Sequence, residues 1–266
     1  MCETTANMEE IKRDYDRNGF VIIRGYLLAE ELQELRDQTH WFFEENPLEG
    51  GKKGLLKNMQ NHDAWFKEQL LHGKHVPMLK TLLEDDLEPA TAAWFDKPPG
   101  QGNVIDPHFD AVGSPRVPRT GCTIWIALDQ ADEGNGCLFY APGSHKNVHE
   151  DKIPLDGFDD AGAATPAEVE PGDAGVHSAL TVHWSGVSRS DRTRRAVSFF
   201  YWGASSKIDP DLRSSQQKAP RRIEVNRPSN RPIRQDHIRP LLADHDGRRI
   251  GVAGHQRRHD GRVDDT

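Results

Sequence analysis

Pro107-His108-Phe109-Asp110 places an imidazole and a carboxylate two positions apart in a short segment that contains proline and leads to glycine. Alternate residues of a β-strand point to the same face, so a strand here would direct the His108 and Asp110 side chains together and Phe109 away. Ordinary hydrogen bonding also produces many His-x-Asp pairs, so the pair alone is a weak signal. It predicts one half of a metal site, and the other half must come from another part of the chain.

A single histidine far downstream is the candidate for that other half. His183 lies between two predicted strands, 174–182 and 196–201, and Arg194 comes close to the start of the second strand. Two histidines and one carboxylate on one side of an iron ion leave positions open for a co-substrate and for oxygen. A guanidinium can hold a carboxylate through two parallel hydrogen bonds. By itself, Arg194 lies among other arginines and is better explained as a surface residue, so its assignment depends on the histidine.

Helical periodicity comes early in the chain and short strands follow. The predicted helices are 9–17, 28–43, 64–71 and 76–83, and 19–25 is predicted to be a buried strand bounded by glycines. From residue 87 onward, short apolar runs alternate with turn residues, and Asn135-Gly136 predicts a hairpin between strands at 122–128 and 137–140. This order predicts an α+β, mainly β fold with a barrel or a double-sheet jelly roll.

Composition narrows the classes of function. The formal net charge of −8 over 266 residues argues against broad nucleic-acid binding. Three cysteines with no CxxC pair predict a reducing compartment and no zinc knuckle or redox pair. The first ten residues are polar and do not resemble a secretory signal, and no run of about 18 apolar residues predicts a membrane span. We therefore expect a soluble cytoplasmic protein without a membrane partner, and nothing in the sequence indicates an oligomeric state.

The last part of the chain differs in composition from the rest. Residues 208–266 are rich in Arg, Pro, Asp and Gly, and they contain few aromatic residues or sustained apolar runs. Such a composition predicts a disordered or irregular tail, whose histidines do not have a recognised zinc-ligand spacing. Residues 1–207 are predicted to form the functional domain, with a jelly-roll core at about 87–207.

The order and spacing of several short motifs resemble the phytanoyl-CoA dioxygenase family of Fe(II)/2-oxoglutarate oxygenases. The matching motifs are Lys97-Pro98-Pro99-Gly100, Pro107-His108-Phe109-Asp110, Trp125-Ile126-Ala127-Leu128-Asp129, Asn135-Gly136-Cys137-Leu138, Pro142-Gly143-Ser144-His145, Pro171-Gly172-Asp173, His183-Trp184-Ser185-Gly186 and Arg194-Arg195-Ala196. The resemblance covers roughly residues 10–207. It implies a double-stranded β-helix, a cupin-like jelly-roll barrel, with N-terminal helices packed on one side.

The resemblance also implies functional residues. His108, Asp110 and His183 are similar to the iron ligands of the family, and a carboxylate at position 110 favours hydroxylation over halogenation. Four further residues are similar to the site for the co-substrate 2-oxoglutarate: Arg194 for its far carboxylate, Ser185 assisting it, Trp125 lining the pocket and, by a looser alignment, Lys57. His177 is interpreted as an interior histidine of the barrel.

The implied activity is hydroxylation of a C–H bond of a small organic molecule, with O2 consumed and with succinate and CO2 as co-products. Arg116 and Arg119, in a predicted lid loop, are candidates for binding an anionic substrate, and solvated loop arginines explain them equally well. Two alternatives stay open. One is a cupin-like binding protein or hydrolase that holds zinc in the same three ligands, and the other is a member of the family without catalytic activity.

Overall fold

Two antiparallel sheets form the centre of the protein, seen in a computed structural model that describes residues 2–46, 54–100, 104–158 and 164–218. These residues belong to one unit, which spans residues 1–222. The larger sheet has six strands in the order β1 (Phe20–Ile23), β9 (Ala174–Ser178), β6 (Gly121–Ala127), β11 (Arg194–Gly203), β3 (Leu87–Lys97) and β2 (Leu55–Lys57). The smaller sheet has four strands in the order β4 (Ile105–His108), β10 (His183–Ser185), β7 (Leu138–Tyr140) and β8 (Thr165–Ala167).

The remaining elements are helices and one short ribbon. Strands β5 (Arg116–Val117) and β12 (Lys207–Ile208) form the ribbon. The α-helices are α1 (Cys2–Asn18), α2 (Ala29–Glu45), α3 (Ala64–His72), α4 (His75–Leu83) and α5 (Pro210–Lys218), and the single-turn helices are η1 (Met59–Asn61), η2 (Glu133–Asn135) and η3 (Ser144–Lys146). Across the described ranges, no helix combines the length and the apolar character that a membrane span requires.

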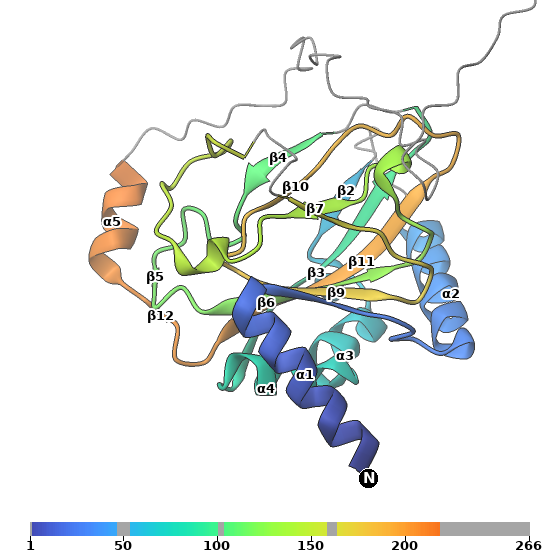
Figure 1. Ribbon diagram of the computed structural model, residues 1–266, viewed down its shortest axis with the longest axis horizontal. Coiled ribbons are helices and arrows are strands. Elements are labelled where there is room, and N and C mark those ends of the chain that lie inside the picture. The colour runs from blue at the N-terminus through green and yellow to red at the C-terminus, as the bar shows by residue number, and fades with distance from the viewer. Residues whose placement is uncertain (1, 47–53, 101–103, 159–163, 219–266) are drawn as a thin grey trace, which may run out of the picture. The chain divides into compact units, whose positions relative to one another are not determined.

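The two faces of the larger sheet bury different sets of side chains. In β6, Ile124 and Ile126 point to one face and pack with the helices in the first core cluster. Trp125 and Ala127 alternate with them and point to the other face, where they pack with Tyr140 and other residues of the smaller sheet in a second cluster. In Figure 1, α1, α3 and α4 lie on one side of the larger sheet, and β4, β10 and β7 lie on the other.

Helix α2 shows why the helices cover that face. Its buried residues, Leu32, Leu35, Thr39 and Phe42, recur at spacings of three and four, so they form one stripe along the helix. Its first turn is closed by the backbone N–H of Leu28, which donates to the Glu31 carboxylate at 2.8 Å. The stripe packs in the same cluster as Val176 and Phe199 of the sheet.

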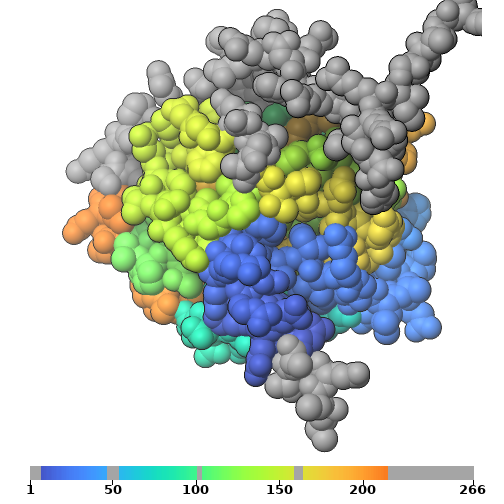
Figure 2. Space-filling model, viewed as in Figure 1, coloured from blue at the N-terminus to red at the C-terminus, as the bar shows by residue number. Residues whose placement is uncertain are grey.

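A surface segment ties the loops after β7 to the first helix. Lys146 in η3 donates to the backbone oxygen of Arg17 at 3.0 Å, and the N–H of Gly143 donates to the backbone oxygen of Asn18 at 2.7 Å. The space-filling view shows this yellow-green segment on the surface beside the dark-blue helix α1 (Figure 2). The first residues after β7 are therefore fixed to the end of α1 by hydrogen bonds.

The structure confirms the predicted combination of early helices and antiparallel strands. Helices α1 to α4 lie where the four helices were predicted, although α1 begins at Cys2 rather than at residue 9, and β1 lies within the predicted strand at 19–25. Over the residues described, the strands form open hydrogen-bonded sheets and not one continuous closed barrel. The predicted tail also starts later than expected, because β12 and α5 continue the ordered chain as far as Lys218; the rest of the tail lies outside the described residues.

The predicted hairpin at Asn135-Gly136 is wrong. Strands β6 and β7 belong to different sheets, so the segment between them crosses from one sheet to the other. Between these strands, Asn135 and Gly136 instead take part in capping the short helix η2. The Asp132 carboxylate and the Asn135 side chain cap each other's backbone N–H groups at the ends of η2, and Gly136 follows with a positive φ of 79°. The same residue types that suit a hairpin also suit this cap.

Candidate active site

Pairing between β4 and β10 brings the two halves of the predicted metal site together. His108 at the end of β4 lies directly opposite His183 at the start of β10, so the two imidazoles extend from the same face of the smaller sheet. Asp110 follows His108 by two residues, and its side chain points to the same side. The ring centroids of the two histidines are 4.3 Å apart.

The three side chains are close enough to bind one ion. His108 Nε2 lies 3.9 Å and His183 Nε2 lies 3.8 Å from Asp110 Oδ1, and all three ligand atoms lie within 4.8 Å of one another. A metal–ligand bond is about 2 Å long, so atoms that share one ion lie within about 4 Å of each other. Only small shifts would therefore be needed for one cation to contact all three.

Both histidines have the tautomer that a metal ligand needs. His108 Nδ1 is 2.8 Å from the backbone oxygen of Asp106, and His183 Nδ1 is 3.0 Å from the backbone oxygen of Thr181. A carbonyl only accepts, so each Nδ1 carries a proton, and in a neutral ring the lone pair is then on Nε2, on the side of Asp110. Burial, followed by the proximity of the other two imidazoles, lowers the pKa of His183 well below its usual value, which keeps the ring neutral.

The Asp110 carboxylate is oriented by two hydrogen bonds to one of its oxygens. Asp110 Oδ2 accepts from Thr123 Oγ1 at 2.5 Å and from His177 Nε2 at 3.1 Å, while Oδ1 faces the two histidines. Burial by itself would raise the pKa of Asp110, but the hydrogen bond from His177 and the neighbouring imidazoles hold it well below the usual range. The carboxylate therefore stays ionised and offers one oxygen to a metal.

His177 and Thr123 were not predicted to take part in the site. His177 is indeed an interior histidine, 2% exposed, but it links Asp110 to Tyr140, whose hydroxyl lies 3.0 Å from His177 Nδ1. Thr123 lies two residues before Trp125 in β6 and therefore on the same face. That alternation is the signal in the sequence that could have identified it.

A second group of buried polar residues adjoins the triad. Arg194 and Lys97 are direct partners on β11 and β3 and are only 1% and 3% exposed. Lys97 Nζ donates to Ser185 Oγ at 2.8 Å and to the backbone oxygen of Gly186, and Ser185 lies two residues after His183 on β10. The Arg194 guanidinium lies 5.4 Å from the centre of the Trp125 ring. The structure thus brings together Arg194, Ser185 and Trp125, as the resemblance implied, and adds Lys97.

This cationic pocket has no counter-charge within the described part of the chain. The neighbouring arginines have partners, since Arg192 pairs with Asp132 and Arg195 pairs with Asp129. Neither Arg194 nor Lys97 forms an ion pair with any described carboxylate, and two buried N–H groups, Arg194 Nε and Trp125 Nε1, have no acceptor. Two buried cations with unused donors are the chemical complement of a carboxylate ligand.

Burial also changes the protonation of these groups. Removal from water, followed by the nearby charge of Arg194, lowers the pKa of Lys97 to about 7. Removal from water lowers the pKa of Arg194 to about 10, which leaves the guanidinium charged at neutral pH. Arg194 is therefore charged at neutral pH, whereas Lys97 is divided between its charged ammonium form and its neutral amine form.

Other candidates from the sequence are placed elsewhere. Lys57 lies on the edge strand β2 opposite Ala93 with an exposed side chain, so the lysine beside Arg194 is Lys97 and not Lys57. Arg116 forms an ion pair with Glu88, and Arg119 forms one with Asp151, 2.6 Å at its longer contact. The two arginines proposed for an anionic substrate are therefore already neutralised by carboxylates of the chain.

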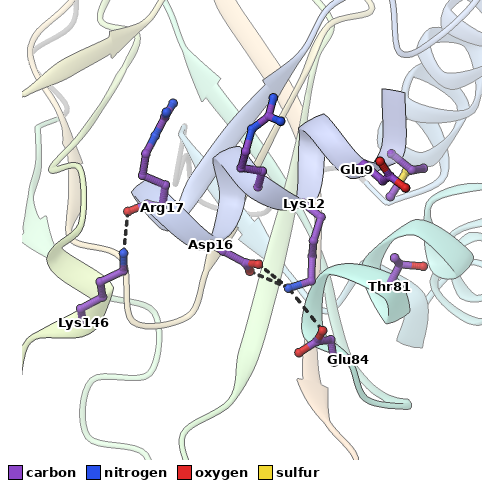
Figure 3. A pocket seen from close by; sticks show the side chains of 9 residues that line it. Glu9, Lys12, Asp16, Arg17, Thr81, Glu84 and Lys146 are labelled. Carbon is purple, nitrogen blue, oxygen red and sulfur yellow. Dashed lines mark hydrogen bonds and ion pairs between the residues drawn. The ribbon is translucent and has the colours of Figure 1, made fainter. Parts of the chain in front are cut away.

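A surface pocket of about 960 Å³ lies between α1 and α4 and contains none of the predicted site residues. The close-up shows that Lys12 contacts both Asp16 and Glu84, and that Lys146 donates to the backbone oxygen of Arg17 (Figure 3). Lys12 is thus neutralised by two carboxylates, and the pocket brings together none of the residues predicted for the metal or the co-substrate.

Comparison with known proteins agrees with this geometry. The model of the family described as "Phytanoyl-CoA dioxygenase (PhyH)" matches residues 15–196. The chain is 27% identical to "Phytanoyl-CoA dioxygenase 1" of Oryza sativa subsp. japonica, over 71% of this chain and 87% of that protein. It is 26% identical to the "Probable alpha-ketoglutarate-dependent hypophosphite dioxygenase" of Stutzerimonas stutzeri, over 74% of this chain and 79% of that protein.

A solved structure supports the same fold. The epimerase SnoN, determined in complex with Fe3+, alpha-ketoglutarate and nogalamycin RO, superposes with a TM-score of 0.68. The match covers 82% of this chain and 92% of SnoN at 23% sequence identity. At that identity, the likeness concerns the arrangement of the backbone and not the substrate.

Proposed function

Because the chain belongs to the phytanoyl-CoA dioxygenase family, we propose that it hydroxylates a C–H bond of a small organic molecule at an iron bound by His108, Asp110 and His183. The protein is an Fe(II)/2-oxoglutarate-dependent dioxygenase. The observation that carries the proposal is the convergence of the three ligand atoms within 4.8 Å beside a buried cationic pocket.

The donor set suits Fe(II). Two neutral imidazole nitrogens and one carboxylate oxygen on one side of an ion are the ligands that non-haem iron oxygenases use, and they leave the remaining positions accessible. The iron and 2-oxoglutarate supply the oxidation, in which 2-oxoglutarate is converted to succinate and CO2 and one oxygen atom of O2 enters the substrate. The contribution of the chain is to bind, orient and enclose these groups.

The residues around the triad support distinct roles in that task. Thr123 and His177 hold Asp110 so that one oxygen faces the metal position. Arg194 and Ser185 suit the far carboxylate of 2-oxoglutarate, because the guanidinium is charged, buried and without an anionic partner in the described chain. Trp125 is buried in the core cluster between the sheets with its ring beside the Arg194 guanidinium, which suits it to cover a carboxylate bound there.

We further propose that residues 1–207 form the oxygenase domain, which β12 and α5 extend to Lys218, and that the two sheets are the halves of a double-stranded β-helix. The second core cluster supports this arrangement, since Trp125, Ala127 and Ala196 of the larger sheet pack with Leu138 and Tyr140 of the smaller one. The helices cover the opposite face of the larger sheet. A ligand between the sheets would therefore be shielded from solvent on both sides.

Anaerobic binding tests the proposal directly. Fe(II) and 2-oxoglutarate added together in the absence of oxygen should produce a weak visible charge-transfer band, and the band should be lost in His183→Ala. His62→Ala, which changes an exposed histidine at the end of η1, is the matched control and should keep it. Absence of the band in the wild-type protein would refute the oxygenase function and would favour a zinc protein, since zinc has no such transition. Release of succinate in a screen of small molecules would then identify the substrate.

A further inference from the structure

We propose that Lys97 is the second cation of the 2-oxoglutarate pocket, where it binds the far carboxylate together with Arg194 and takes up a proton when the co-substrate binds. This inference rests on the proposed function, since it assigns a further residue to the same site. The sequence analysis considered Lys57 for this task and had no reason to single out Lys97.

Strand pairing places the two cations side by side. Arg194 and Lys97 are direct partners across β11 and β3, so their side chains leave the sheet on the same face. Arg194, Ala196 and Ser198 alternate along β11 on that face, and Ala196 belongs to the core cluster between the two sheets. Both cations therefore point into the space between the sheets and not toward the helices.

Gly136 shows how close the two side chains are. Its backbone oxygen accepts from Arg194 at 3.1 Å, and a Cβ built on it would lie 3.0 Å from Lys97 Nζ and 2.8 Å from the backbone oxygen of Gly186. The residue also has a φ of 79°, a conformation that glycine adopts without strain. Because position 136 has no side chain, the Arg194 guanidinium and the Lys97 ammonium can both lie close to the backbone of Gly136.

A purely structural role does not explain this pair. Lys97 does connect β3 to β10 through Ser185, but a neutral side chain could make that link without the repulsion of a neighbouring guanidinium. Burying two like charges without a counter-charge is unfavourable, and the penalty is removed when an anion binds between them. The unused N–H of Arg194 and that of Trp125 show that the pocket has spare donors as well as spare charge.

The charged and titratable groups around Lys97 are few. Arg194 faces it from β11 and disfavours its charged form, whereas Cys137, which precedes β7, acts in the opposite direction only when ionised. Burial raises the pKa of Cys137 to about 12, so that thiol is neutral near pH 7 and provides no counter-charge. Asp96, adjacent to Lys97 in β3, acts on Arg194 from a distance. A carboxylate bound beside Lys97 and Arg194 would give them the counter-charge that no ion pair of the described residues provides.

Proton uptake follows from these surroundings. Burial and Arg194 lower the pKa of Lys97 to about 7 in the ligand-free protein, so a large part of the lysine is neutral above that pH. A carboxylate beside it favours the ammonium form, and binding must then draw a proton from the buffer. By linkage, the dissociation constant of 2-oxoglutarate should rise up to about tenfold for each pH unit above 7.

Calorimetry can count this proton. Titration of the anaerobic Fe(II)-loaded protein with 2-oxoglutarate, at pH 8 in two buffers of different ionisation enthalpy, should show uptake of close to one proton. Lys97→Met should bind more weakly and without uptake, whereas Lys97→Arg, which is always charged, should bind without uptake and with little change of affinity between pH 7 and 9. Lys67→Met, which changes an exposed lysine on α3, should behave as the wild type.

The outcomes separate the two proposals. If the wild-type protein does not bind 2-oxoglutarate, the proposed function fails. If it binds, but Lys97→Met retains both the affinity and the proton uptake, the oxygenase function stands and the role of Lys97 is refuted. Should Lys97→Met not fold, proton uptake that persists in Lys97→Arg, or a wild-type dissociation constant that does not change between pH 6 and 9, refutes it equally.

Discussion

The two oxygens of the Asp110 carboxylate have different partners. One accepts hydrogen bonds from Thr123 and His177, and the other faces the two histidine ligand atoms. Such outer partners fix the direction in which a carboxylate offers its lone pair, and their loss commonly weakens metal binding. The polar residues behind the triad are therefore part of the site even though they do not reach the metal position.

Removing these partners should weaken metal binding without abolishing it. We expect His177→Ala to lower the affinity for Co(II), used as a stable substitute for Fe(II), by about 10- to 100-fold. Thr123→Val should have an effect in the same direction, because it removes the hydroxyl but keeps the shape. Equilibrium titration monitored by absorbance measures both, and Thr123→Ser, which keeps the hydroxyl, is the control. An unchanged affinity for Co(II) in both His177→Ala and Thr123→Val would show that metal binding does not depend on the hydrogen bonds to Asp110.

Two glycines provide a matched pair for testing the cationic pocket. Gly136 and Gly143 both have positive φ, 79° and 75°, so alanine at either position carries a backbone strain of about 1–2 kcal/mol. At Gly143 the new methyl group meets open space, whereas at Gly136 it meets Lys97 and the Gly186 carbonyl. Gly136→Ala should therefore weaken 2-oxoglutarate binding measured by calorimetry, and Gly143→Ala should not. Equal affinities would mean that the pocket tolerates displacement of Lys97.

At the scale of the elements, helix α4 is joined to strand β11 by a buried hydrogen bond. His75 Nε2 lies 2.6 Å from the Tyr201 hydroxyl, which itself donates to the backbone oxygen of Leu70 in α3 at 2.9 Å. Because the hydroxyl proton is used toward Leu70, His75 donates from Nε2. Burial lowers its pKa to about 4, which keeps the ring neutral near pH 7. Its ring also stacks on Phe199 at a centroid distance of 4.8 Å.

The burial of His75 makes the stability of the fold sensitive to acid. Burial lowers the pKa of His75 to about 4 in the folded protein, below the usual value of 6.5, so the unfolded chain binds the proton first. The stabilising contribution is complete above pH 6.5 and is lost as the pH falls from 6.5 to 4, a change of about 3 kcal/mol. In urea unfolding followed across this range, His75→Gln should show a shallower pH dependence than the wild type. His62→Gln, an exposed histidine, should not differ from it.

At the scale of the whole molecule, ligand binding and stability are linked. A co-substrate that binds only the folded protein stabilises it by about 2.7 kcal/mol at 100 times its dissociation constant. For a domain of this size, that corresponds to a rise in Tm of roughly 5–10 °C. In thermal unfolding, adding 2-oxoglutarate to the Fe(II)-loaded protein should produce this rise in the wild type and in Arg119→Ala, whose side chain pairs with Asp151. The rise should be absent in Arg194→Ala; if it persists there, Arg194 does not bind the carboxylate.

Much of the architecture could be predicted because its signals are local. Helices α1 to α4 have apolar residues at helical spacing, and β6 is a short apolar run bounded by turn residues, so the types of these elements follow from the order of residues. The hairpin at Asn135-Gly136 could not be predicted correctly. A turn sequence determines the local backbone conformation, but the sheet that the next strand joins depends on partners that are distant in the chain.

The sequence by itself determined which groups are present and how they are spaced within a segment: His108 with Asp110, His183 with Ser185, and Arg194 at the start of a strand. Only the tertiary structure decided that His108 faces His183 across β4 and β10, and that Lys97 rather than Lys57 accompanies Arg194. The physical reason is that the burial of a side chain and the charges around it depend on residues that are close in space but distant in the sequence. Lys97 loses its water and meets a guanidinium only when β3, β11 and β10 come together.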